Sequence, residues 1–173
     1  SWFIIPTYVL IIKYRRVKRD KQRAMMETRY VRIIATYISS HDHAAFPTFP
    51  RLRSNFNKQV LINQLYELSI SLMGKQRERL NRLYEKPQLQ ELLKKGIRSI
   101  RKRAKIHYLK YYSIRRMSYD QLVEVKRYLS SRNSRLRLAS QLAVLNYEPC
   151  LLMDVLRDYP FHLTTWDQMY IFD

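Results

Sequence analysis

Cysteine and glycine are nearly absent from this sequence, and each shortage removes a class of structures. The single cysteine, Cys150, excludes a disulfide within the chain and any zinc site built from several cysteines. Two glycines cannot build a glycine-rich phosphate loop, and with only six prolines long loops and tight hairpins are scarce. Leu, Ile, Arg, Lys, Gln and Glu are common instead, and most of these favour helices. The 173 residues therefore predict one all-helical domain.

Acidic residues are also scarce relative to basic ones. The chain has 33 Lys and Arg against 14 Asp and Glu, a net charge of +19. Residues 13–32 hold nine basic and two acidic side chains, residues 94–116 hold ten basic and no acidic ones, and the remainder is nearly neutral. Such a charge favours an anionic partner, which is nucleic acid, an anionic membrane surface or an acidic protein.

The N-terminal segment "WFIIPTYVLII" (2–12) carries no charge, and "KYRRVKRDKQR" follows it at once. An apolar run closed by basic residues is typical of a membrane helix that leaves the bilayer on the cytoplasmic side. Eleven residues are about half of a span, so we expect 1–12 to be the C-terminal part of a transmembrane helix that begins before Ser1. Residues 13–39 would then form a basic juxtamembrane helix. Its first cations are Lys13, Arg15, Arg16, Lys18 and Arg19. The alternative is a buried N-terminal helix or strand of a soluble protein.

Further along the chain, Pro47 and Pro50 interrupt the helical pattern and predict a linker over residues 40–57. The patterns beyond it predict helices over 58–73, 75–86 and 89–103, the last with a break near Gly96. Residues 104–130 then align with 134–160 at a shift of 30, which pairs Ile106 with Leu136. Helix pairs that recur at such a period indicate an α-solenoid. We therefore expect a solenoid over 58–173 that continues past Asp173.

On a helical wheel, the segment "NSRLRLASQLAVLNYEP" (133–149) predicts a helix with one wide apolar face. Its apolar residues cover about half the circumference, while Arg137, Ser140 and Gln141 fall on the opposite, polar side. The expected packing residues of this helix are Leu136, Arg137, Ala139, Leu142 and Ala143.

This segment resembles the first helix of a HEAT repeat, and Asn133, Leu136-Arg137, Ala139 and Leu142-Ala143 fill that pattern. Residues 58–173 are similar to HEAT-repeat, armadillo-like proteins of Bacteroidetes-type bacteria that carry an N-terminal membrane helix. The segments that support this are "RLNRLYEKPQLQELLKK", "YLSSRNSRLRLASQLAVL" and "YPFHLTTWDQM". The resemblance implies a membrane-anchored superhelix without catalytic residues. Asn133 stands where the family commonly has an Asp that joins an inter-repeat ladder with the conserved Arg, so that ladder is not expected.

Two groups of residues suggest chemistry only weakly. His41, Asp42 and His43 could share a metal, but no third or fourth ligand follows at a suitable spacing, which favours a polar linker. Cys150 could act as a nucleophile with His107 or His162 as base, but a lone cysteine is more often a small buried residue. We therefore expect no enzyme activity, no metal and no cofactor.

The second basic block is the strongest functional candidate. Its cations are Lys94, Lys95, Arg98, Arg101, Lys102, Arg103, Lys105, Lys110, Arg115 and Arg116. Tyr108, Tyr111 and Tyr112 lie between them. The segment could bind nucleic acid, with its cations on phosphates and its tyrosines stacked on bases. It could also face anionic lipid or an acidic protein, or be a solvated face whose tyrosines belong to the core. The leading hypothesis is a scaffold on the inner membrane, with one span, a cytoplasmic solenoid and an unknown protein partner. The alternative is a nucleic-acid-binding protein that uses residues 94–116.

Overall fold

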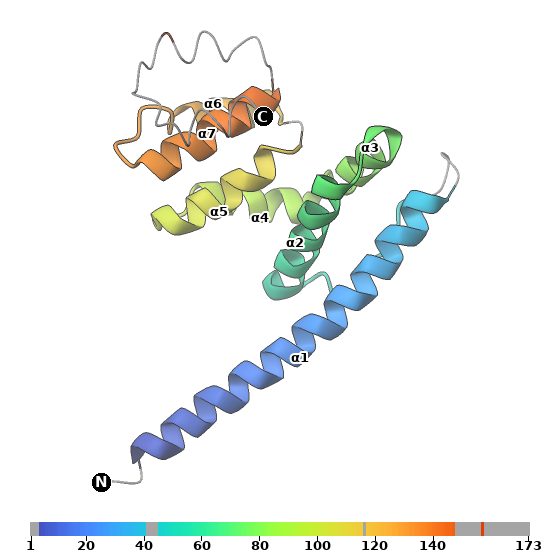
Figure 1. The fold of residues 1–173 in the computed structure, drawn as a ribbon, viewed down its shortest axis with the longest axis vertical. Coiled ribbons are helices and arrows are strands. Elements are labelled where there is room, and N and C mark those ends of the chain that lie inside the picture. The colour runs from blue at the N-terminus through green and yellow to red at the C-terminus, as the bar shows by residue number, and fades with distance from the viewer. Residues whose placement is uncertain (1–3, 41–44, 116, 148–156, 158–173) are drawn as a thin grey trace.

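The computed structural model describes residues 4–40, 45–115, 117–147 and 157 of the chain. These residues form seven helices and contain no strand, which confirms the all-α prediction for this part of the chain. The helices are α1 (Ile4–Ser39), α2 (Asn55–Ser71), α3 (Gly74–Leu83), α4 (Pro87–Ile97), α5 (Lys102–Tyr112), α6 (Tyr119–Lys126) and α7 (Ser134–Tyr147). Figure 1 shows α1 as a long rod beside α2, with α4 to α7 grouped on the other side of α2.

Helix α1 is continuous over 36 residues, with no break at the expected boundary between residues 12 and 13. Its second half packs against α2 and α3 and buries Met26, Tyr30, Ile34 and Tyr37 in the common core. These four residues recur at helical spacing and so share one face. Residues 26–39 therefore pack in the helical body, whereas the sequence predicted one juxtamembrane helix over 13–39.

The connection between α1 and α2 is packed rather than free where the structure describes it. Phe49 is buried and meets the Tyr30 ring edge-on, with the ring centroids 5.6 Å apart. The Tyr30 hydroxyl donates to the carbonyl of Pro50 at 2.9 Å, and Lys86 Nζ donates to that of Pro47 at 2.9 Å. Helix α2 begins at Asn55, so the connection is also shorter than the expected linker over 40–57.

The helix expected over residues 89–103 is two helices. Pro87 occupies the first turn of α4, where its missing N–H costs nothing. Helix α4 ends at Ile97 and α5 begins at Lys102. Gly96 allows the two helices to approach, because its backbone lies directly against the Tyr108 ring.

Helices α5, α6 and α7 fall within the repeat seen in the sequence. Helix α7 packs against both α5 and α6. Ser118 and Gln121 form a capping box at the start of α6. The Asn133 side chain accepts a hydrogen bond from the backbone N–H of Leu136 at 3.0 Å and so caps α7. The remaining residues of the second repeat unit, and all of the third, lie outside the described residues except Arg157.

The wheel for residues 133–149 is only partly correct. Leu136 and Ala143 are buried, whereas Ala139 and Leu142 are half-buried, as is Arg137. Ser140 and Gln141 were placed on the polar side, and this was wrong because both are buried. Two neighbours, α5 and α6, cover more of the α7 circumference than one apolar stripe can. The Ser140 hydroxyl is satisfied locally, since it donates to the carbonyls of Leu136 and Arg137.

Candidate anionic-surface and partner-binding sites

The first basic block lies on the part of α1 that leaves the body. Every side chain from Leu10 to Met25 is exposed. In Figure 1 this half of the helix extends away from all other helices. It carries seven basic residues and one acidic one, Asp20. Large apolar side chains share this stretch with them. Leu10 is 65%, Ile11 47% and Ile12 47% exposed.

Within the parts of the chain that the structure describes, no helix combines the length and the apolar content that a membrane crossing requires. The expected full span therefore gains no support from these residues.

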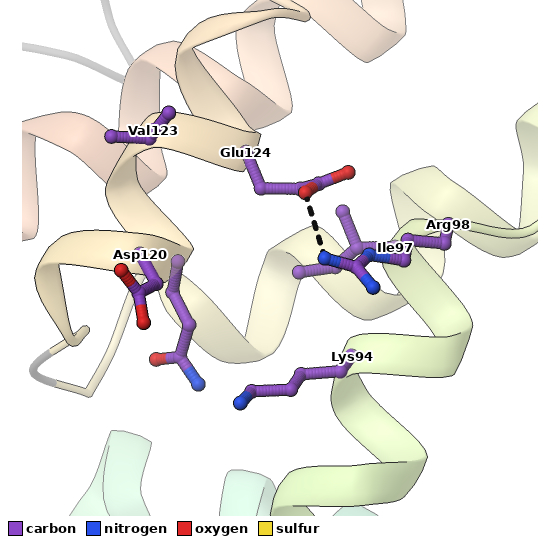
Figure 2. Close-up of a pocket in the computed structure, with 7 residues that line it drawn as sticks. Lys94, Ile97, Arg98, Asp120, Val123 and Glu124 are labelled. Atoms are coloured by element: carbon purple, nitrogen blue, oxygen red, sulfur yellow. Dashed lines mark hydrogen bonds and ion pairs between the residues drawn. The ribbon is translucent and has the colours of Figure 1, made fainter.

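The second basic block does not form one surface. Lys94, Lys95, Arg98, Arg101, Lys102 and Arg103 are exposed. Two of them are paired with carboxylates: Lys95 Nζ lies 2.7 Å from Glu91, and Arg98 Nη2 lies 3.2 Å from Glu124. Figure 2 shows Lys94 of α4, and Arg98 directly after α4, facing Asp120 and Glu124 of α6. These side chains line a pocket of about 320 Å³. The two signs of charge meet there, so this pocket is not a purely anion-binding site.

Lys105 and Lys110 lie over aromatic rings and are half-buried. Lys105 Nζ is 4.6 Å from the centroid of the Tyr128 ring. Lys110 Nζ is 4.5 Å from the Tyr66 ring and 5.2 Å from the Tyr111 ring. These cation–π contacts hold both ammonium groups against aromatic rings.

Arg115 was expected at an anionic surface, and this was wrong because only 4% of the residue is exposed. Its guanidinium donates to the side-chain oxygens of Gln121 at 2.8 Å and Gln90 at 3.2 Å. It also lies over the rings of Tyr112 and Tyr84. Burial lowers the pKa of Arg115, opposed by the nearby Tyr112 and Tyr84 hydroxyls. Arg115 thus joins α4 to α6. Arg116 lies outside the described residues.

Two tyrosines of this block, Tyr111 and Tyr112, are core residues, and neither is available to stack on bases. Tyr111 and Tyr112 are fully buried, and Tyr108 is half-buried with its hydroxyl bonded to Gln59 Oε1 at 2.7 Å. The Tyr111 hydroxyl lies 2.9 Å from His107 Nε2 and also donates to Asn63. Burial lowers the pKa of His107, and the neighbouring charge of Lys110 lowers it further.

One further groove runs along α5, and we call it the α5 groove. It is lined by Tyr66 of α2, by Arg103, Ile106, His107 and Lys110 of α5, by Ser113 directly after α5, and by Ala139 and Leu142 of α7. Its volume is about 470 Å³. The sequence placed Arg103 and Lys110 in a basic block but did not join them to Tyr66, Ala139 or Leu142. Helical spacing indicates that the four α5 residues share a face, but it does not show which helices flank that face.

The weaker chemical candidates gain no support. His41, Asp42, His43, Cys150 and His162 all lie outside the described residues. Among those that the structure does place, no cluster of three or more His, Cys, Asp or Glu side chains could hold a metal ion.

Comparisons with protein-family models, with curated proteins and with solved structures found no match for this chain. The resemblance to HEAT-repeat proteins therefore remains a prediction.

Proposed function

We propose that this chain is a non-catalytic helical scaffold that the first half of α1 anchors in an anionic membrane. The observation that carries the proposal is the free N-terminal half of α1, which is exposed from Leu10 to Met25 and combines apolar with basic side chains. In a helix surrounded by water, the three consecutive exposed aliphatic side chains of Leu10, Ile11 and Ile12 would remain unburied.

The apolar part of α1 fits end-on insertion better than a position flat on the surface. Leu10, Ile11 and Ile12 follow one another at about 100° per residue, so together they span about 200° of the helix circumference. An apolar face this wide suits a largely apolar environment better than the boundary between lipid and water. Residues 4–12 rise by about 13 Å at roughly 1.5 Å per residue, which is about half of the ~30 Å hydrocarbon core.

Basic side chains follow immediately after Ile12 and are distributed around the helix. Lys13, Arg15, Arg16, Lys18 and Arg19 point in five different directions around the axis. At head-group depth each would contribute about 1 kcal/mol of attraction to anionic lipid. The order of apolar and then basic residues favours a body on the cytoplasmic side, so we propose that the membrane is the inner membrane of a bacterium.

The body supports a scaffold role through its stacked helices. Helix α7 lies against α5 and α6, as successive units of a solenoid would. We propose that residues 58–173 form a HEAT-like solenoid that binds a protein of a membrane complex. Among the described residues, no group of three or more His, Cys, Asp or Glu side chains could hold a metal ion.

Co-sedimentation with vesicles tests the membrane contact. One variant replaces Lys13, Arg15, Arg16, Lys18 and Arg19 with Gln. The matched control removes the same charge from the body by replacing Lys94, Lys95, Arg98, Arg101 and Lys102 with Gln. At about 1 kcal/mol per cation, we expect the first variant to lose between roughly three and four orders of magnitude in partitioning onto phosphatidylserine-containing vesicles.

The control variant should keep most of its vesicle binding. Equal losses in both variants would show that net charge rather than the α1 site is responsible. Duplex DNA binding with a steep salt dependence, lost only in the control variant, would favour the nucleic-acid alternative.

A further inference from the structure

The α5 groove has the form of a peptide-binding site. Its floor consists of the half-buried Ile106, Ala139 and Leu142, which come from two packed helices. Apolar side chains that are neither fully buried nor scattered singly mark a place for a partner. The volume of about 470 Å³ can take the anchoring side chains of a bound segment.

The charged side chains of the groove have a single sign. Arg103 and Lys110 line it, and no acidic side chain does so among the described residues. The two are seven residues apart on α5, which places them on one side of the helix, about 10 Å apart at roughly 1.5 Å per residue. This differs from the pocket between α4 and α6, where Asp120 and Glu124 balance the cations.

The groove is also held in place before any partner binds. Lys110 lies over the rings of Tyr66 and Tyr111. Gln59 Nε2 donates to the Tyr111 hydroxyl at 2.9 Å, which ties α2 to α5. A site that needs no rearrangement loses less free energy on binding.

We propose that the α5 groove binds an amphipathic helix of a partner protein, with apolar anchors on one face and acidic residues beside them. The anchors contact Ile106, Ala139 and Leu142, and two carboxylates about two helical turns apart pair with Arg103 and Lys110. This is helix-in-groove recognition with charge complementarity at the rim. Nucleic acid and lipid head groups fit less well, because their phosphates gain nothing from an apolar floor. The inference deepens the proposed scaffold role and does not depend on membrane attachment.

Charge exchange between protein and peptide tests the proposal. Two fluorescent 18-residue helical peptides share the same leucine stripe, and they carry either Glu or Lys at flanking positions seven residues apart. We expect fluorescence anisotropy with the full chain, without vesicles, to show at least tenfold tighter binding of the Glu peptide. The Arg103→Glu, Lys110→Glu variant should reverse that preference.

The matched control is Lys75→Glu, Arg82→Glu, which makes the same charge change at two exposed positions seven residues apart on α3. It should keep the preference of the natural chain. If the Lys110 substitution lowers the melting temperature, Arg103→Glu alone, at an exposed residue, provides a second measurement of the change in peptide preference. Ala139→Trp should weaken both peptides by filling the groove.

Three results would overturn the inference. The first is that the Glu peptide does not bind at concentrations up to about 1 mM. The second is that the α3 control loses its preference for the Glu peptide as completely as the groove variant does. The third is that the chain self-associates and Arg103→Glu abolishes the self-association, which would assign the groove to a second copy. Vesicle binding of the groove variants is measured alongside. Its retention would show that a failure here leaves the membrane proposal intact.

Discussion

The backbone of Gly96 in α4 lies against the ring of Tyr108 in α5, and no space remains between them for a Cβ. The ring cannot move away freely, because the Tyr108 hydroxyl donates to Gln59 Oε1 of α2 at 2.7 Å. This contact sets the approach of α4 to α5 and joins both to α2. It therefore helps to position the α5 groove.

Gly96→Ala should destabilise the chain although alanine is the better helix former. The added methyl group meets the Tyr108 ring, and overpacking of this kind costs about 1–3 kcal/mol. That exceeds the gain in helix propensity of about 0.5–1 kcal/mol. Urea unfolding followed by circular dichroism measures the difference.

The control for this prediction is the same substitution in a Tyr108→Ala background. With the ring removed, Gly96→Ala should become neutral or stabilising. If it destabilises both backgrounds equally, the ring contact does not determine the fit at residue 96.

Arg115→Ala should lower the free energy of unfolding by about 2–3 kcal/mol, because it removes hydrogen bonds from a buried charged group to Gln90 and Gln121. Arg101→Ala, at an exposed position, should change it by no more than about 0.5 kcal/mol. Chemical denaturation of both variants makes the comparison. Normal stability with weakened vesicle or peptide binding in Arg115→Ala would instead assign Arg115 to a binding surface.

The stability of the chain should fall above pH 10, in part through Tyr112. Burial raises the pKa of Tyr112 to about 12, with Arg115 opposing the rise and Glu124 adding to it. An unfolded tyrosine ionises near pH 10, so the unfolded chain releases its proton first. The contribution is complete below pH 10 and is lost as the pH rises through about 12.

Tyr112→Phe should therefore reduce the dependence of unfolding free energy on pH between 10 and 12. Near pH 7 it should be nearly neutral, because the buried Tyr112 hydroxyl has no hydrogen-bond partner in the described part of the chain. Tyr119→Phe, at a residue 72% exposed, is the matched control. An unchanged pH dependence in Tyr112→Phe would show that this phenol titrates outside that range.

The sequence predicted the elements better than their contacts. Helix-favouring composition and the breaks at Pro87 and near Gly96 predicted an all-α fold and the end of α4. The same patterns did not distinguish Arg115, which is buried, from Arg98, which is exposed. Burial of a guanidinium depends on Gln90 and Gln121 arriving from other helices, and local spacing carries no information about that.

The limits of local pattern are clearest at the α5 groove and on α7. A helical wheel assigns one polar side to a helix, but α7 packs against two neighbours. Ser140 and Gln141 are therefore buried although the wheel places them on the polar side. Likewise, Tyr66 lies 37 positions before Arg103 in the chain and lines the same groove. Neither relationship follows from the periodicity of a single helix.

The depth of α1 in a bilayer tests the central claim most directly. An environment-sensitive fluorophore is attached to a single cysteine placed in turn at residues 10, 11 and 12, in a Cys150→Ser background, with Thr28→Cys as the control. End-on insertion predicts a blue shift at all three positions on phosphatidylserine-containing vesicles and no shift at residue 28. A shift at only one face of the helix, or at none of the three positions, would contradict the account.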